Sequence, residues 1–381
     1  MTVFPKKKIL FVDQYASLGG GQRVLLDLMS VFKESDFDVA VLAPGGGELE
    51  ELVRSRFSAD VSFLSMQALQ LNARKKNLID LLKLISFSIL FFFRSFAVFR
   101  KFDFIYCNGG RIFFPCALIS LFLSGKRFIY HIHIQHMPLE NRAIECISRL
   151  PATFRIFFNS KFIVDQWKLA ARLWNQKFVL LENGLSREFS HSKFSENRFV
   201  DASTPKNLCV FGRVSSEKGQ DILLDLFNEF PTLAFHIVGE SDFLNRAYFD
   251  SLKKHAGNRI QFHGKKKDIL QLMQTMPVHF SLVPSTWDEP FGLVAVESMA
   301  GSCITIVRAR GGLVEIAENT GAMSFETTAD LVKILKSLLQ RPSGDLRELA
   351  FSQYSKTIDR YGYEKFRTRV LDAFKNSETH I

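Results

Sequence analysis

The sequence predicts an α/β protein with two Rossmann-like domains, each built on a parallel sheet, that face each other across a cleft. Apolar runs of strand length alternate with helix-length segments along the whole chain. Those runs are continuous rather than alternating, which is typical of parallel strands covered on both faces. The alternation pauses near residues 182–184 and resumes after residue 205, and 381 residues are enough for two domains.

In the first half, β-branched and aromatic runs predict six strands, with helices such as 22–32 and 112–122 between them. The predicted strands are 9–12, 39–42, 61–64, 104–107, 128–131 and 156–159. In the second half, the predicted strands are 208–211, 234–238, 260–263, 280–284 and 305–307. Residues 186–205 are polar and irregular, which favours an interdomain connection. We therefore expect domains at 1–184 and 185–362, with a last helix, 363–376, packing back on the first.

Composition sets the class of protein but not its partner. Apolar residues make up 47% and charged residues 23%, which is typical of a folded, soluble chain. The 49 basic against 39 acidic residues give a net charge of +10, which suits nucleotide phosphates, acidic lipid headgroups or nucleic acid. Five scattered cysteines without a CxxC pair favour a reducing compartment over a disulfide framework. The N-terminus passes directly into a strand, so we expect no signal peptide.

The segment from Leu81 to Phe102 is unusually apolar. Its longest uncharged run, 84–93, has ten residues, whereas a spanning helix needs about 20. We therefore expect that it does not cross a bilayer. Two interpretations stay open: a helix packed on the sheet, or a helix lying on an anionic membrane surface. The cations at 74–76 favour the second, because each contributes about 1 kcal/mol near anionic headgroups.

Two acids and a helix start lie together in residues 284–297. Glu289 lies at a loop tip after a strand, and Glu297 lies in the helix expected to begin near residue 291. Both carboxylates can reach one elongated ligand, although each alone is also an ordinary surface acid. Pro290 suits a helix start, where free backbone N–H groups and the helix dipole favour an anion. Those N–H groups belong to Phe291, Gly292 and Leu293.

A second charged loop follows the strand at 208–211. Arg213 comes just after that strand, and Lys218 is expected to begin the next helix. Two cations there can neutralise a diphosphate, Arg through its planar fork and Lys as a point charge. The alternative is ordinary surface charge on a loop between strand and helix.

The first half offers weaker candidates. The turn at Gly20 and Gly21 gives G-x-G-x-x-V instead of G-x-G-x-x-G, and no acid ends the second strand, so NAD binding is disfavoured. His131 falls at a strand end, with His133 as the alternative register. A third histidine, His136, brings a metal cluster into consideration, but this spacing does not resemble a ligand pair on a helix, so we expect no metal. Asn108 follows the fourth strand and is expected to face the cleft or to form a turn.

The sequence EPFGLVAVE, with its E-x7-E spacing, and the sequence GRVSSEKG resemble the motifs of family-4 retaining glycosyltransferases of GT-B fold, the glycosyl transferases group 1. The resemblance implies that Glu289 contacts the donor hexose and Glu297 the nucleotide ribose. It implies that Arg213 and Lys218 bind the donor pyrophosphate. The other implied contacts are backbone at Gly264 and Lys265 for the base, Gly20 and Gly21 for the donor phosphate, His131 for the transferred sugar, and Asn108 and His133 for the acceptor.

The resemblance further implies transfer of a hexose from a UDP-sugar or GDP-sugar to a glycan or lipid-linked glycan, with retained configuration and without a metal or other cofactor. Basic charge and the apolar segment suggest polysaccharide or lipopolysaccharide (O-antigen) assembly by a cytoplasmic enzyme, peripheral on the inner face of the cell membrane. We expect no nucleic-acid partner. A nucleotide-sugar epimerase or phosphorylase of the same fold, a dehydrogenase and a catalytically silent binding subunit stay open.

Overall fold

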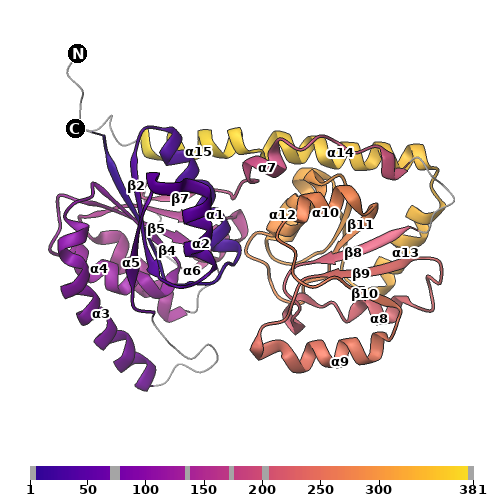
Figure 1. Cartoon of the computed structure of the whole chain (residues 1–381), viewed down its shortest axis with the longest axis horizontal. Coiled ribbons are helices and arrows are strands. Elements are labelled where there is room, and N and C mark those ends of the chain that lie inside the picture. Colours follow the sequence, from indigo (N-terminus) through magenta and orange to yellow (C-terminus); the bar gives the residue numbers. More distant parts are fainter. Residues whose placement is uncertain (1–5, 69–77, 134–137, 171–175, 200–205, 376–381) are drawn as a thin grey trace, which may run out of the picture. The chain divides into compact units, whose positions relative to one another are not determined.

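The computed structural model describes residues 6–68, 78–133, 138–170, 176–199 and 206–375. The chain forms two compact units, residues 1–182 together with 367–381, and residues 183–366 (Figure 1). Each unit has its own sheet and its own hydrophobic core. The prediction of two parallel-sheet α/β domains is therefore confirmed.

The first unit contains a sheet of seven parallel strands in the order β3-β2-β1-β4-β5-β6-β7. The strands are β1 (Lys8–Asp13), β2 (Asp38–Pro44), β3 (Ser62–Met66), β4 (Phe104–Asn108), β5 (Arg127–Ile132), β6 (Thr153–Phe158) and β7 (Phe178–Leu180). The strand order reverses between β1 and β4. In open sheets of this kind, ligands bind outside the carboxyl ends of the strands at such a switch point.

Helices cover this sheet because each buries an apolar face against it. They are α1 (Gly20–Glu34), α2 (Glu48–Phe57), α3 (Leu78–Phe99), α4 (Phe113–Ser120), α5 (Pro138–Arg149) and α6 (Lys161–Ala170). The last helix, α15 (Tyr363–Lys375), brings the chain back to this unit after residue 366. Its Phe374 ring lies 4.7 Å from Phe32 and 5.4 Å from Phe104, centroid to centroid.

The second unit contains a sheet of six parallel strands in the order β10-β9-β8-β11-β12-β13. The strands are β8 (Asn207–Phe211), β9 (Ala234–Val238), β10 (Ile260–Phe262), β11 (Val278–Val283), β12 (Ile304–Arg308) and β13 (Met323–Phe325). The switch point lies between β8 and β11. The helices are α7 (Arg187–Ser190), α8 (Ile222–Leu226), α9 (Arg246–Ala256), α10 (Ile269–Thr275), α11 (Leu293–Ala300), α12 (Gly312–Thr320), α13 (Thr328–Gln340) and α14 (Ser343–Tyr361).

Three local expectations need correction. The helix after Pro290 begins at Leu293 rather than near residue 291, because Gly292 is its N-cap with φ of 111°. Lys218 ends a 3-10 turn, Ser216–Lys218, and the next α-helix begins only at Ile222. The segment 186–205 is not wholly irregular, since it contains α7, whose first turn is capped by Ser186.

Helix α3 coincides with the apolar segment. By length and composition, residues Leu82–Phe99 are sufficient to cross a membrane, the only such stretch found in the described part of the chain. The ten-residue uncharged run therefore does not by itself exclude a span. The packing of α3 argues against a span, because α3 connects β3 to β4 within one sheet and buries Phe91 and Phe99 in the core of its unit.

Candidate functional site

A polar cluster lies at the switch point of each sheet. In the second unit it comprises the loops that follow β8 and β11, two neighbouring strands. In the first unit it comprises the ends of β1 and β4 with the start of α1. Because carboxyl ends of parallel strands share one edge of a sheet, residues far apart in sequence meet there.

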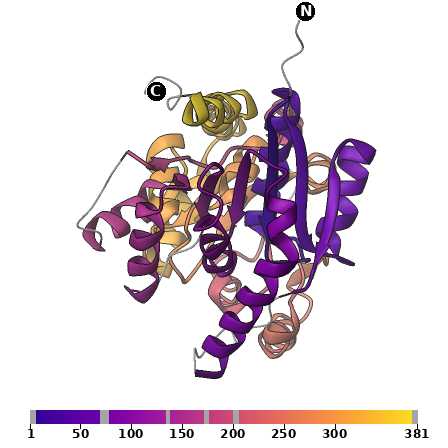
Figure 2. The same cartoon turned by 90° about the vertical axis from the view of Figure 1, so that its left-hand side faces the viewer.

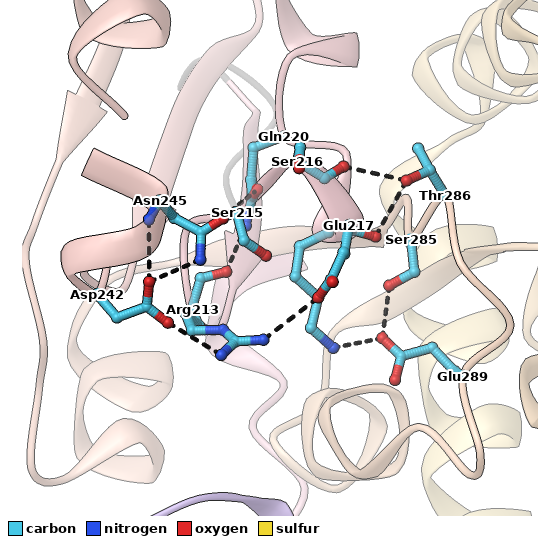
Figure 3. Close-up of polar contacts among 11 residues, drawn as sticks. Arg213, Ser215, Ser216, Glu217, Gln220, Asp242, Asn245, Ser285, Thr286 and Glu289 are labelled. Atoms are coloured by element: carbon cyan, nitrogen blue, oxygen red, sulfur yellow. Dashed lines mark hydrogen bonds and ion pairs between the residues drawn. The ribbon is translucent and has the colours of Figure 1, made fainter. Parts of the chain in front are cut away.

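Lys218 and Glu289 are in direct contact in the second unit. The Lys218 ammonium donates to Glu289 Oε1. The same oxygen accepts a hydrogen bond of 2.6 Å from the Ser285 hydroxyl, as Figure 3 shows. The Glu289 side chain is 8% exposed and that of Lys218 is 24% exposed. A carboxylate this buried needs a cation or hydrogen-bond donors, and it has both. Lys218 and Glu289, both predicted from the sequence, therefore form an ion pair at the edge of the second sheet.

Two hydrogen bonds from Thr286 link the loop after β11 to the loop after β8. The Thr286 hydroxyl donates to the backbone oxygen of Ser216 at 3.0 Å, and the Thr286 N–H donates to that of Glu217 at 2.9 Å. The Lys218 ammonium also lies 5.6 Å from the centre of the Trp287 ring, within the range of a cation–π interaction. The loops after β8 and β11 are thus fixed to each other.

Arg213 lies on the same loop as Lys218 but in a different environment. Its guanidinium donates to Asp242 at 3.1 Å and to Glu217 at 3.4 Å (Figure 3). Its side chain is 50% exposed. Such exposed ion pairs contribute only about 0–1 kcal/mol, so Arg213 can exchange these carboxylates for a phosphate at little cost. Burial raises the pKa of Asp242, but the hydrogen bonds from Asn245 and the charge of Arg213 outweigh it and hold this pKa below its ordinary value.

Glycines allow a second loop to approach the backbone of Glu289 closely. The Gly312 N–H donates to the backbone oxygen of Glu289 at 2.6 Å. A Cβ at Gly311, where φ is 56°, would lie 2.5 Å from that oxygen. This packing sets the position of the Glu289 loop and gives Gly311 and Gly312 a structural role.

The other residues predicted for the donor site lie in or just before α11 and after β10. Phe291 is buried against Tyr361 at a ring distance of 5.5 Å, and Leu293 begins α11. Glu297 lies in the second turn of α11 and is half-buried. Gly264, with φ of 64°, and the exposed Lys265 follow β10, on the same edge of the sheet as Arg213.

The first unit has a buried network around Asp13, which the sequence did not single out. The Asp13 carboxylate accepts hydrogen bonds from Gln22 at 3.0 and 3.1 Å, from Asn108 at 2.5 Å and from the Tyr15 N–H at 2.8 Å. Burial raises the pKa of Asp13, and these donors oppose the shift. The only signal in the sequence was an acid directly after the apolar run of β1.

Asn108 and the two histidines extend that network. Asn108 Oδ1 lies 2.6 Å from His133 Nε2, and the His131 and His133 rings are 3.9 Å apart. His131 is fully buried, with Nδ1 2.7 Å from the Tyr106 hydroxyl and no hydrogen-bond partner for Nε2 among the described residues. Burial, and next the charge of His133, hold the pKa of His131 well below its ordinary value. The ring is therefore neutral at pH 7, and a ligand reaches it only after movement of its surroundings.

The N-terminus of α1 lies beside His133. Gly19 is its N-cap, Gly20 and Gly21 are its first residues, and a Cβ at Gly21 would lie 3.5 Å from the His133 ring. The first N–H groups of a helix have no partner within the helix. His136 lies outside the described residues, and no group of three or more metal-ligating side chains occurs within them.

A cavity of about 590 Å³ lies elsewhere in the first unit, between β3 and α3. Its lining includes Met66, Leu90 and Arg94 and none of the candidate residues above.

Solved structures share this fold over nearly the full length of both chains. Anabaena Alr3699/HepE in complex with UDP and glucose has a TM-score of 0.77 at 19% identity, covering 97% of this chain and 99% of that one. A glycosyltransferase from Rickettsia africae has a TM-score of 0.78 at 15% identity, covering 99% and 100%. The lipopolysaccharide outer core galactosyltransferase WaaB, in its apo form, has a TM-score of 0.69 at 16% identity, covering 97% and 99%. Comparison with curated proteins gave no match.

Models of glycosyltransferase families match both halves of the chain. The model of the family described as Glycosyltransferase Family 4 matches residues 18–189, and that of Glycosyl transferases group 1 matches residues 193–357. These matches contain the switch-point cluster of the second unit and, in the first unit, the start of α1 and the end of β4, and they agree with the fold. The chain is a GT-B glycosyltransferase that belongs to family 4, the glycosyl transferases group 1.

Proposed function

We propose that this glycosyltransferase transfers a hexose, with retained anomeric configuration, from a nucleoside diphosphate sugar to a glycan or lipid-linked glycan. The observation that carries the proposal is the contact of Lys218 with the buried Glu289, next to Arg213, at the switch point of the second sheet. Cations suit a diphosphate, and a held carboxylate suits sugar hydroxyls.

In this proposal the second unit holds the donor. Arg213 and Lys218 neutralise the diphosphate, Glu289 accepts hydrogen bonds from hexose hydroxyls, and Glu297 accepts them from the ribose. Glu289 can accept these bonds because its second oxygen, Oε2, makes no hydrogen bond or ion pair with the other described residues. The remaining donor contacts are backbone at Gly20, Gly21, Gly264, Lys265, Phe291, Gly292 and Leu293.

The reaction needs stabilisation of negative charge more than a nucleophile. As the bond between C1 and the phosphate oxygen breaks, negative charge grows on the leaving diphosphate, and Arg213 and Lys218 stabilise it. That phosphate takes the proton of the acceptor hydroxyl, whose oxygen forms the new bond to C1 on the same face. This scheme needs no metal. In this proposal His131 orients the transferred sugar once its surroundings have moved to expose it, and Asn108 and His133 contact the acceptor.

Comparison structures favour particular substrates. HepE structures hold UDP with glucose and UDP-glucose, which supports a UDP-hexose ahead of a GDP-hexose for this chain. WaaB is a lipopolysaccharide outer core galactosyltransferase, which supports polysaccharide or lipopolysaccharide (O-antigen) assembly. The proposal places this assembly on the inner face of the cell membrane. The acceptor is then a lipid-linked glycan.

Release of UDP or GDP from a panel of nucleotide hexoses tests the proposal. Wild type is expected to release diphosphate from one donor, and Glu289→Ala and Lys218→Ala to lose at least about tenfold of that rate. Lys336→Ala is the matched control, because its ion pair with Glu229 is exposed, at 55% and 47%, on the same unit. Equal release by wild type and both site variants would contradict the site. NMR of the product's anomeric configuration tests retention, and free-sugar release or a phosphate requirement would indicate an epimerase or a phosphorylase.

A further inference from the structure

Helices α3 and α4 expose an apolar surface that the donor chemistry does not use. Thirteen large apolar side chains are exposed among the described residues, and eight of them belong to α3, α4 and the turn after α4. This concentration exceeds the scattered apolar residues that soluble surfaces normally carry. The α3–α4 face consists of Leu82, Ile85, Ile89, Leu90, Phe93, Phe114, Leu121 and Phe122.

The polarity of α3 is inverted relative to a helix that faces water. Two of its three serines, Ser88 and Ser95, are 1% and 4% exposed, whereas Ile89 and Phe93 are 50% and 75% exposed; the third serine, Ser86, is exposed. The buried Ser88 hydroxyl has a hydrogen-bond partner within the helix, because it donates to the backbone oxygen of Leu84 at 2.6 Å. Exposed positions recur every three or four residues, so they form one stripe along the helix. An apolar solvent-side stripe predicts an apolar partner.

Aromatic contacts make the surface continuous between the two helices. The Phe92 ring lies 5.2 Å from that of Phe122, after α4, and 5.5 Å from that of Phe93. Phe93 and Phe122 are among the most exposed residues of the face, at 75% and 64%. Figure 1 shows α3 and α4 side by side at the periphery of the first unit, and Figure 2 turns that side toward the viewer.

The positive charges of α3 favour an anionic partner. From Leu82 to Lys101 the chain carries four cations and no acid. Lys83 and Arg94 lie on the exposed stripe, and no ion pair to either occurs within the described residues. We propose that the α3–α4 face lies on the surface of a bilayer that contains anionic lipids, with its apolar side chains among the acyl chains and these cations at the headgroups.

The geometry requires the helix to lie on the bilayer instead of crossing it. Phe91 and Phe99 anchor α3 in the core of the sheet, with Phe99 6.1 Å from Phe128, ring to ring. A helix of 22 residues is about 33 Å long and provides an extended contact along the surface. A second copy of the chain fits less well, because pairing two such faces would bring Lys83 and Arg94 of each copy together without acids.

The inference deepens the proposed function only in its choice of acceptor, since a lipid-linked glycan would be presented at this same surface. Vesicle binding itself requires no transferase activity. The two proposals therefore fail separately, one by flotation and the other by diphosphate release.

Flotation of the full chain with phosphatidylcholine vesicles, with and without phosphatidylglycerol, tests the inference. Wild type is expected to float with the anionic vesicles and to be released by salt. The triple variant Ile89→Ser, Phe93→Ser, Phe122→Ser changes only exposed side chains, so it should fold. Its partition onto anionic vesicles is expected to fall by about tenfold or more, because three apolar groups leave the acyl region.

A control variant and a light-scattering measurement distinguish membrane binding from other causes of a change in flotation. Leu244→Ser with Phe351→Ser removes apolar side chains of similar exposure, 66% and 52%, from the second unit and should float like wild type. Lys83→Gln with Arg94→Gln should lose the preference for anionic vesicles. Wild type that does not float, or a triple variant that floats equally well, would overturn the inference. So would a dimer, measured by light scattering, that the triple variant dissociates without any vesicle binding.

Discussion

The ammonium of Lys218 contacts Oε1 of Glu289, and this contact joins the loop after β8 to the loop after β11. The two residues are 71 positions apart and meet because their strands are neighbours at the switch point. Ser285 donates to the same oxygen at 2.6 Å. The position of a nearly buried carboxylate therefore depends on one cation and one hydroxyl.

Ser285→Ala is expected to slow transfer by about tenfold, because hydrogen bonds to charged groups contribute about 1.5–3 kcal/mol and about 1.4 kcal/mol corresponds to tenfold in rate. The measurement is the rate of diphosphate release together with thermal stability. Ser281→Ala is the control, because Ser281 is also buried on β11 and donates to Ser298 at 2.8 Å without touching Glu289. Equal rate losses in both variants would show that Ser285 acts only through stability.

Gly311→Ala is expected to displace the Glu289 loop. Its Cβ would lie 2.5 Å from the Glu289 oxygen and 2.7 Å from the Glu289 nitrogen, and φ of 56° adds strain. We expect a loss of transfer activity of about tenfold or more. Gly257→Ala separates the two causes, because Gly257 has φ of 52° but nothing within 4 Å of its Cβ. Activity of Gly311→Ala equal to that of Gly257→Ala would contradict the packing role.

Asn108→Asp is expected to destabilise the first unit in a pH-dependent way. The new carboxylate would lie against that of Asp13, which Asn108 Nδ2 now contacts at 2.5 Å in a buried site. Uncompensated buried charge costs about 3 kcal/mol or more. In the folded variant, burial next to each other raises the pKa values of the two carboxyls. The loss of stability therefore grows as pH rises above about 4. Asn108→Ala adds no charge but removes one donor to Asp13, so its loss of stability should depend less on pH than that of Asn108→Asp. A pH-independent loss in Asn108→Asp would be contrary to this account.

Buried histidines predict lower stability in mild acid. Burial, followed by the charge of His263, lowers the pKa of His236 to about 4, and burial, followed by the charge of Lys206, lowers that of His279 to about 4. The unfolded chain binds these protons below pH of about 6.5, whereas the folded chain does not. The free energy of unfolding should therefore fall as pH drops from about 6.5 toward about 4. Thermal unfolding measures this slope, and His236→Gln should flatten it; a stability that rises over the same range would be the opposite result.

The sequence predicted the strands well because each is a continuous apolar run. It missed β7 (Phe178–Leu180) and β13 (Met323–Phe325), edge strands of three residues each, which are too short to show a period. It also treated 186–205 as irregular, although Ser186 caps a turn of helix that buries Phe189. Short elements owe their conformation to packing, and local pattern does not reveal it.

The candidate site was partly readable. Arg213, Lys218 and Glu289 could be predicted as one group because they stood at strand ends within a dense motif, and the structure brings Lys218 and Glu289 into contact. Ser285 and Asp13 could not, since a serine and an acid near a strand end are common and only the fold reveals their partners. For α3 the sequence is apolar on all sides, so only the packing of Phe91 and Phe99 reveals which stripe is exposed.

Calorimetric titration of the full chain with UDP and GDP tests the central claim, that the Lys218–Glu289 contact and Arg213 mark the donor diphosphate site. Wild type should bind one nucleoside diphosphate. Lys218→Gln and Arg213→Gln should each weaken binding by about tenfold or more, because each removes a charge-assisted contact to phosphate. Lys336→Gln, on the exposed pair with Glu229, should bind like wild type. Equal affinity in wild type and both site variants would contradict the account.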